Sequence, residues 1–464
     1  MDSLDKMRAG SQLSGAEQIA LVLRLSIPAI LAQISTIIME YIDASMVGSL
    51  GASSSAAIGI VSTTTWLIGG LCGAIGTGFT VGIAHRIGAG EDKEARKYVK
   101  TGLLTVLGFA LIMMGIVIII HRKLPVWMGG AEDVLDNASR YFLIYGFMLP
   151  LMQVNYTGAG MLECSGNMKV PSILNVVMCF LDVVFNAFFI YPDRDVSLFG
   201  GSISVHLPGA DLGVTGAAVG TMCAEALGAA GIIVSILVFS KKLHIRKDEK
   251  GWLSPEKWKI AIKMSLPVML SSSIMGIAYV ISTLIVAPLG NVSITANSFS
   301  ITAESLCYMP GYGIAHAATT LVGQALGAGM KKLERHFAFL TVAIGMIVMT
   351  LTGVLLFIFA PEMISIMSPD ENVRELGTII LRIEAFAEPM FGASIVAEGV
   401  FRGLGKTGIP SVLNLVSMWI VRLPLSALMA GHFGLIGVWY VMCGELIFRG
   451  VLFVIALIRV ESRR

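Results

Sequence analysis

The pentapeptide "PSILN" at Pro171–Asn175 returns as "PSVLN" at Pro410–Asn414, 239 residues further along the chain. The same offset relates "GAG" at Gly88–Gly90 to "GAG" at Gly327–Gly329. It holds without a gap until about Tyr191, where the first copy carries a longer loop. An offset that survives over this length indicates an internal duplication, of the kind from which many membrane transporters are built.

The composition is that of a polytopic membrane protein. Of the 464 residues, 55% are hydrophobic and 14% are charged, and the mean hydropathy is +0.80. Soluble domains carry about 25% charged residues. The net charge of +2 predicts no general affinity for nucleic acid. Six scattered cysteines without a C-x-x-C spacing predict neither disulfides nor a metal site, and we expect no cofactor.

Apolar segments of about 20 residues are long enough to cross a bilayer as helices. The polar N-terminal stretch lacks the apolar core of a signal peptide, so we expect the first helix to direct insertion. Twelve such segments are predicted, at about 19–48, 56–84, 98–121, 139–162, 170–191, 213–240, 260–287, 295–325, 337–360, 378–401, 409–431 and 434–459.

The charges orient these helices. Loops such as "HRIGAGEDKEARKYVK" and "KKLHIRKDEKGWLSPEKWK" are rich in Lys and Arg, whereas the opposite loops "GSLGASSS" and "APLGNVS" carry no charge. The positive-inside rule then places both termini in the cytoplasm, with the chain in the cell inner (plasma) membrane. Because each half has six helices, the halves are parallel repeats. We expect an all-α protein with an N-terminal lobe at 1–240, a linker at 241–259 and a C-terminal lobe at 260–464.

A parallel duplication of this kind is typical of transporters, with a substrate path between the two halves. The segment "GLGKTG" at Gly403–Gly408 is not a phosphate-binding loop, because Val400 stands where that motif needs its first glycine. The sequence also lacks HExxH and GxSxG motifs, so we expect no enzyme and no ATPase. Transport would then draw on an ion gradient.

Four stretches together carry a family resemblance: "YIDASMVGSLG", "GIAHAATTLVGQALGAGMKKLERH", "VFRGLGKTGIPSVLN" and "WIVRLPLSALM". Across residues of about 15–460, the chain resembles the multidrug and toxic compound extrusion (MATE) family. The resemblance implies a two-lobe antiporter of twelve helices. It would expel bulky, often cationic drugs in exchange for H⁺ or Na⁺.

Carboxylates in the first half are the candidate coupling residues. The resemblance assigns this role to Asp43 near the outer end of the first helix, and Glu40 lies one turn earlier. The family tends to have Asn and then Asp in the fifth helix; here Asp182 precedes Asn186, one turn apart on one face. Burial disfavours the charged form of a carboxyl group, so such groups can take up a proton or a cation. The alternative for Glu40 and Asp43 is a pair of acids at a helix end that reach toward water, and the alternative for Asp182 is a structural hydrogen-bond network.

Other polar residues in the spans are candidates for lining the cavity. In the first half these are Gln33, Asn155, Tyr156 and Asn175. In the second half the acids Glu304, Glu384 and Glu388 are candidates for binding a cationic substrate, and structural pairing with a neighbouring Arg is the alternative. His316 has no partner motif and is expected either to pack or to make a polar contact that breaks the helix, rather than to relay protons.

A flippase for lipid-linked precursors, from the same wider superfamily, is the alternative function. It would be expected to carry several basic residues in its cavity, whereas this chain has acids within its spans. Three acids in the first half that can carry protons favour H⁺ over Na⁺ as the coupling ion. We expect the protein to be a monomer.

Overall fold

The computed structural model describes residues 3–198, 203–245 and 251–463. In this part of the chain, the first repeat and the short helix before it form these elements: α1 Ser3–Arg8, α2 Gly15–Gly48, α3 Ala52–Ile75, α4 Thr77–Gly88, α5 Asp92–Ile120, α6 Leu124–Trp127, α7 Glu132–Cys164, α8 Lys169–Ile190, β1 Pro192–Leu198, β2 Ile203–Ala210, α9 Gly213–Val234 and a π-helical turn at Ser235–Phe239.

The second repeat forms these elements: α10 Pro255–Val286, a 3₁₀ turn at Ala287–Leu289, α11 Asn291–Gly327, α12 Lys331–Met367, α13 Glu371–Glu384, α14 Glu388–Gly403, α15 Gly408–Val416, a π-helical turn at Ser417–Arg422 and α16 Leu423–Ser462.

These elements confirm the predicted all-α architecture of twelve membrane helices. Two of the predicted helices are broken, one between α3 and α4 and one between α13 and α14. The last two predicted helices correspond to one run of α15, the π-helical turn and α16. Within α16, Gly434 has a non-helical backbone (φ 60°, ψ −146°) at the boundary predicted between the two helices. Eight of the described helices, some of them joined across a break, are long and apolar enough to span a membrane by those criteria alone. Among the others, α13 and α14 are shorter than the 18 residues that these criteria require.

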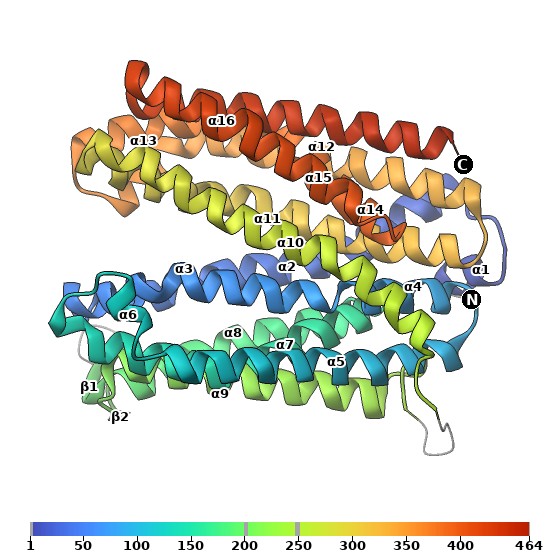
Figure 1. The fold of residues 1–464 in the computed structure, drawn as a ribbon, viewed down its shortest axis with the longest axis horizontal. Coiled ribbons are helices and arrows are strands. Elements are labelled where there is room, and N and C mark those ends of the chain that lie inside the picture. Colours follow the sequence, from blue (N-terminus) through green and yellow to red (C-terminus); the bar gives the residue numbers. More distant parts are fainter. Residues whose placement is uncertain (1–2, 199–202, 246–250, 464) are drawn as a thin grey trace.

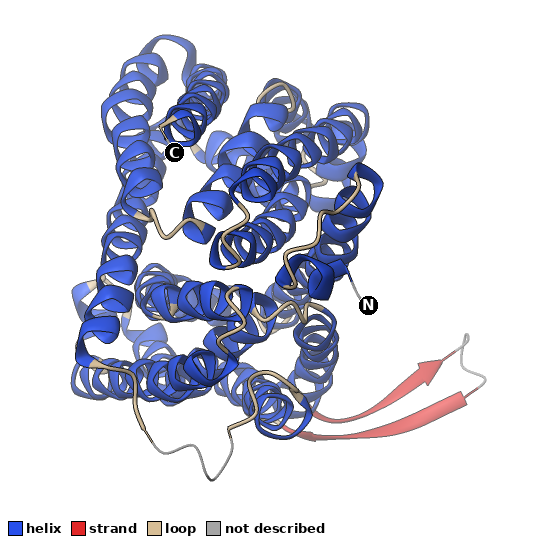
Figure 2. Ribbon diagram, turned by 90° about the vertical axis from the view of Figure 1, so that its right-hand side faces the viewer, coloured by secondary structure: helices blue, strands red, loops and turns tan. Residues whose placement is uncertain are grey.

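The two repeats lie side by side as two lobes (Figure 1). Both termini lie at one end of the helical bundle, which we call the terminal end. The opposite end carries a feature that was not predicted: the longer loop of the first repeat forms an antiparallel hairpin of β1 and β2, in which Pro192 pairs with Ala210. The hairpin projects away from the helices (Figure 2).

The first helix of each repeat crosses into the other lobe at the terminal end. Leu21, Val22 and Leu25 of α2 are buried in a cluster formed mainly by helices of the second lobe. In the same way, Ala261 of α10 packs in a cluster of the first lobe, and α10 runs diagonally across the bundle (Figure 1). The hydroxyl of Ser265 in α10 donates to the Ile75 carbonyl at 2.7 Å. Each lobe is therefore completed by a helix from the other repeat.

The two "GAG" segments of the repeat contact one another across the lobes. A Cβ atom on Gly88 would lie 2.1 Å from the carbonyl oxygen of Gln324. On the other side, a Cβ atom on Gly327 would lie 2.0 Å from the carbonyl oxygen of His85. Only glycine permits this approach of backbone to backbone, which explains why the motif stands in both copies.

The short helix α1 lies against both lobes at the terminal end. Arg8 Nη2 donates to the Ser165 carbonyl of the first lobe and to Gln324 Oε1 of the second, at 2.9 Å in each case. Leu4 and Met7 of α1 are buried in the same cluster as the start of α2. The segment that precedes the first span is thus part of the contact between the lobes.

Candidate functional site

Asp43, Asp182 and Asn186 meet inside the first lobe. The amide nitrogen of Asn186 donates to Asp43 Oδ1 at 2.9 Å and to Asp182 Oδ2 at 3.0 Å. Asp182 and Asn186 have no exposed surface, and Asp43 is half-buried. The structure therefore brings together two carboxylates from α2 and α8 that share a single donor. We refer to these three residues as the Asp–Asn–Asp cluster.

Close packing of α9 against α8 holds this cluster. A Cβ atom on Gly220 of α9 would lie 2.1 Å from Asn186 Oδ1, so any larger residue at this position would displace the amide. Thr221, the next residue of α9, lies near Asp182, and Tyr141 of α7 lies near both carboxylates. Four helices thus surround the cluster.

Within the described part of the chain, no Lys or Arg forms an ion pair with either Asp43 or Asp182. Asp182 Oδ1 and Asn186 Oδ1 are buried and have no hydrogen-bond partner among the described residues. Buried charges in proteins are normally paired, and those within membrane helices commonly mark ion or proton pathways. Carboxylate, amide and hydroxyl oxygens are suited to a proton or a hard cation.

Glu40 lies apart from the hydrogen bonds of this cluster. It is exposed and lies near Asp43 on one side and near Tyr308 of α11, in the second lobe, on the other. Gln33, two turns earlier on α2, is partly exposed. Glu40 and Asp43, which the sequence places on nearly the same face of α2, therefore have different neighbours. Asp43 faces α8, whereas Glu40 lies where α2 meets the second lobe.

The remaining predicted residues of the first lobe have different surroundings. The Asn175 amide donates to the Ala32 carbonyl and to Thr36 Oγ1, both at 3.0 Å, and so joins α8 to α2. The Asn155 amide donates at 2.9 Å to the carboxylate of Glu225, a residue of α9 that sequence reasoning missed. Its signal was available, since Glu225 is the only charged residue in the span at about 213–240.

Tyr156 lies between the lobes. It is 58% exposed, yet its charged neighbours are Glu163 of its own helix α7 and Arg402 and Glu398 of α14 in the second lobe. A Cβ atom on Gly73 of α3 would lie 3.5 Å from its ring. That Tyr156 lines the substrate cavity stays a prediction.

The acids of the second lobe are enclosed. Glu384 and Glu388 have no exposed surface and Glu304 has 6%. All four carboxyl oxygens of Glu384 and Glu388 lack a hydrogen-bond partner among the described residues. Glu388 packs against Gly353 of α12, whose Cβ atom would lie 2.9 Å from its own. In this structure the three acids contact only protein, so their role in substrate binding stays a prediction.

Other acids of the second lobe are paired with arginines, which the sequence did not reveal. Arg449 donates from Nε and Nη2 to the two carboxyl oxygens of Glu445, at 2.8 and 2.9 Å. Ser417 also donates to Glu445, and Arg422 lies 3.8 Å away. This network joins α16 to the π-helical turn before it.

A polar contact between the lobes lies near the terminal end. His316 Nδ1 of α11 lies 2.6 Å from Glu163 Oε2 of α7, so of the two alternatives for His316 the structure shows the polar contact. Thr320 donates to the Glu163 carbonyl at 3.1 Å, and Gln324 Nε2 donates to the Cys164 carbonyl at 2.7 Å. Three successive turns of α11 thus bind the end of α7, and we call this contact the lobe clasp.

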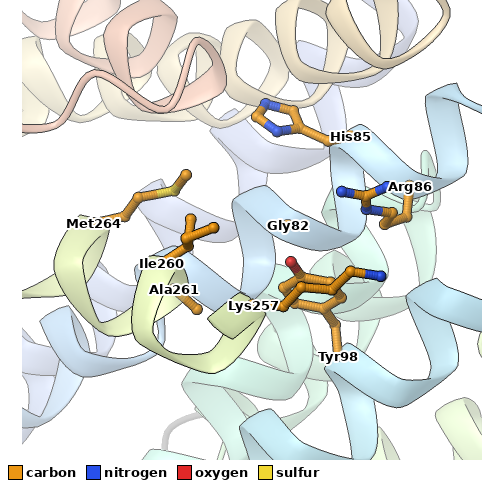
Figure 3. A pocket seen from close by; sticks show the side chains of 9 residues that line it. Gly82, His85, Arg86, Tyr98, Lys257, Ile260, Ala261 and Met264 are labelled. Atoms are coloured by element: carbon orange, nitrogen blue, oxygen red, sulfur yellow. The ribbon is translucent and has the colours of Figure 1, made fainter. Parts of the chain in front are cut away.

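A small pocket also lies at the terminal end, between α4, α5 and α10 (Figure 3). Its volume of about 90 Å³ is too small for a bulky compound. The two permanent cations that line it are already paired, Arg86 with Glu91 and Lys257 with Glu94. The pocket is therefore not the functional site.

Comparisons with known proteins agree with the repeat. The MatE family model matches residues 28–188 and 267–428, and these two segments are the two copies of the duplication. The probable multidrug resistance protein NorM of Thermotoga maritima is 23% identical over 436 residues, which cover 93% of this chain and 90% of that protein. The uncharacterized transporter YisQ of Bacillus subtilis is 22% identical, with 88% of each chain covered.

Solved structures share the fold. A multidrug resistance MATE family transporter in an outward-facing conformation superposes with a TM-score of 0.86 at 20% identity, over 96% of each chain. The Vibrio cholerae MATE transporter VcmN in its bent form gives a TM-score of 0.81 at 19% identity, over 97% of this chain and 98% of that one. With a family match in both repeats and a shared twelve-helix fold, this chain belongs to the MATE family of multi-pass membrane transporters.

Proposed function

We propose that this transporter exports bulky cationic or amphipathic compounds in exchange for H⁺ or Na⁺. The observation that carries the proposal is the Asp–Asn–Asp cluster, in which two carboxylates within the membrane bundle share one amide donor. Such an arrangement is stabilised when a proton or cation neutralises it. A relative over nearly the whole chain is named as a probable multidrug resistance protein, which supports the substrate class.

The position of α2 suggests how an ion would move the lobes. The outer part of α2 presents Asp43 to α8, whereas its first turns are buried in the core of the second lobe. An ion that binds the cluster changes the contact between α2 and α8. Because α2 also belongs to the other lobe, the change alters the relative stability of the two lobe arrangements, which is what coupling requires. The rocking units we propose are 1–240 and 260–464, joined by the linker 241–259.

The substrate would lie between the lobes, next to Tyr156 and Glu40. Both side chains are exposed, and both lie beside residues of the second lobe. An aromatic ring with a nearby carboxylate suits an organic cation. A lipid-linked precursor would instead need unpaired cations there, and Arg402, the cation beside Tyr156, is paired with Glu398.

We also propose that the protein is a monomer in the cell inner membrane with both termini in the cytoplasm. The basic loops of the sequence support this orientation. The terminal end is then the cytoplasmic end, and the lobe clasp closes the path on that side.

Proteoliposomes with an imposed pH gradient or an imposed Na⁺ gradient test the proposal, with ethidium as the transported probe. We expect one of the two gradients to drive ethidium transport in the wild type, and Asp43→Asn to lower that rate at least tenfold. The matched control is Asp136→Asn, because Asp136 lies on the surface and pairs only with Arg140. Normal transport by Asp43→Asn under both gradients would show that the cluster is not the coupling site.

A further inference from the structure

We propose that Glu225 is a second site for the coupling cation, closer to the terminal end than Asn186 and beside Asp182 of the Asp–Asn–Asp cluster. This inference rests on the proposed function and extends it from one ion site to two. Glu225 of α9 accepts a hydrogen bond from the Asn155 amide at 2.9 Å. In the described part of the chain, no Lys or Arg forms an ion pair with it.

The packing of α9 on its neighbours fixes the depth of Glu225. Gly220 of α9 lies against Asn186, near the outer end of α8, whereas Gly228 lies against Met178 and Asn155. Glu225 stands between these two contacts. Since α9 runs toward the terminal end, Glu225 lies beyond Asn186 on the way to that side of the membrane.

Asp182 is the member of the Asp–Asn–Asp cluster that lies nearer to Glu225. Its Oδ2 accepts from Asn186, while its Oδ1 is buried without a partner among the described residues. Thr221 and Glu225 are one turn apart on α9 and so share a face, and both interact with Asp182. The unpartnered oxygen therefore belongs to the carboxyl group of the cluster whose charge is felt by the second acid.

The surroundings of Glu225 suit a group that gains and loses a cation. Asp182 and Cys179 of α8 are its titratable neighbours, and Asn155 is its amide donor. None of these is positively charged. Two neighbouring acids without a cation titrate as a pair, so one proton or cation between them can be held by either. An ion that enters from the outer side would reach Asp43 and Asp182 first and Glu225 next.

With H⁺ as the coupling ion, the step breaks the O–H bond on Asp182 and forms one on a carboxyl oxygen of Glu225, leaving Asp182 as the carboxylate. With Na⁺, the ion exchanges carboxylate and amide oxygens of the cluster for those of Glu225 and Asn155. The chemistry is transfer of one monovalent cation in either case, and the ion supplied in the experiment separates the two.

The test uses the full chain in proteoliposomes with a pH gradient in one arm and a Na⁺ gradient in the other. Cation entry and ethidium movement are recorded together for wild type, Glu225→Gln, Glu225→Asp and Asp43→Asn. Glu132→Gln is the matched control, since Glu132 is exposed in the first turn of α7. Ethidium binding to the purified variants reports whether each is folded.

We expect Glu225→Gln to bind ethidium as the wild type does, but to lose gradient-driven transport about tenfold or to move fewer cations per ethidium. Glu225→Asp should recover part of the loss. Wild-type rate and stoichiometry in Glu225→Gln, together with an inactive Asp43→Asn, would overturn the second site and leave the proposed function standing. Normal transport by Asp43→Asn would instead overturn the proposed function.

If Glu225→Gln does not fold, Asn155→Ala carries the test, because it removes the donor and keeps the charge. We expect it to shift the H⁺ or Na⁺ concentration for half-maximal transport at least threefold. An unchanged cation dependence in this variant would overturn the proposal, since a purely structural contact would leave that dependence as it is.

Discussion

The two lobes share one fold but differ in the partner that each gives to a hydrogen-bonded carboxylate inside the bundle. The repeat offset places Ser282 at the position of Asp43 and Val421 at the position of Asp182, so the second copy cannot form the Asp–Asn–Asp cluster. In its place, Glu445 is held by Arg449 with two hydrogen bonds. The second lobe therefore supplies its own cation, whereas the first lobe supplies only an amide.

This difference shows how a duplicated scaffold can divide its work. A carboxylate paired with arginine inside the protein is costly to separate from its partner, and so contributes structure. A carboxylate without such a partner depends on a cation from outside, and its stability then changes as the ion comes and goes. On this view the first lobe responds to ions and the second lobe does not.

The largest effect is expected from breaking the Glu445–Arg449 pair of the second lobe. We expect Arg449→Ala to lower the free energy of unfolding by about 3–5 kcal/mol, because it leaves the charge of Glu445 buried with a weaker partner. Thermal unfolding of the purified protein measures the change. Arg140→Ala is the control: its pair with Asp136 is exposed, and such pairs contribute about 0.5 kcal/mol or less. Equal losses of unfolding free energy in the two variants would show that the Glu445–Arg449 pair stabilises the second lobe no more than a surface pair does.

The clasp between the lobes should have the next largest effect. His316→Ala removes the contact of His316 with the carboxyl group of Glu163 but leaves the Thr320 and Gln324 bonds in place. We expect the fraction of molecules open at the terminal end to rise about tenfold, which corresponds to about 1.4 kcal/mol. Spin labels on the repeat-related, exposed Lys93 and Lys332 would report the opening as a longer distance.

A control for this experiment removes a contact within one lobe. Asn175→Ala breaks the bonds from α8 to α2 and should leave the distance between the labels unchanged. An unaltered distance distribution in His316→Ala would mean that the clasp does not set the balance between states.

Particular elements show how much of the structure can be predicted from the sequence. Twelve helices and their boundaries follow from runs of apolar residues, which are local features, and even the break at Gly434 falls where the helix boundary was predicted. The meeting of Asp43 with Asp182 could be expected only from their similar depth in the first lobe, because the two residues come from helices far apart in the sequence.

What was missed depends on which helices become neighbours. The pairs Asn155–Glu225 and Glu163–His316 each join two different helices. The periodicity of residues within a single helix cannot predict such contacts. The crossing of α2 and α10 into opposite lobes is of the same kind, since each helix reads as a plain apolar span. The hairpin of β1 and β2 was not predicted, because the sequence comparison of the two repeats showed only that this loop is longer in the first repeat.

Neutralising an acid of the first lobe should have the reverse effect of breaking the arginine pair. We expect Asp182→Asn to leave the free energy of unfolding unchanged or to raise it by up to about 1 kcal/mol, because it removes a buried charge that has no cation. The same variant should lose gradient-driven ethidium transport. Thermal unfolding and proteoliposome transport are measured on one preparation. A loss of stability as large as that of Arg449→Ala would show that the cluster is structural.

The enclosed acids of the second lobe should give the smallest effect. Glu388 has no exposed surface and no hydrogen-bond partner among the described residues, and a carboxyl group in such a place is stable as the neutral acid. Because Gln has nearly the same volume as neutral Glu, we expect Glu388→Gln to change the free energy of unfolding by less than about 1.5 kcal/mol and ethidium affinity by less than about threefold. Unfolding and ethidium titration measure the two quantities, and Glu40→Gln, at an exposed acid beside Tyr308, is the comparison that should weaken binding more. A larger loss of ethidium affinity in Glu388→Gln than in Glu40→Gln would place the substrate within the second lobe, and the division of work between the lobes would then be wrong.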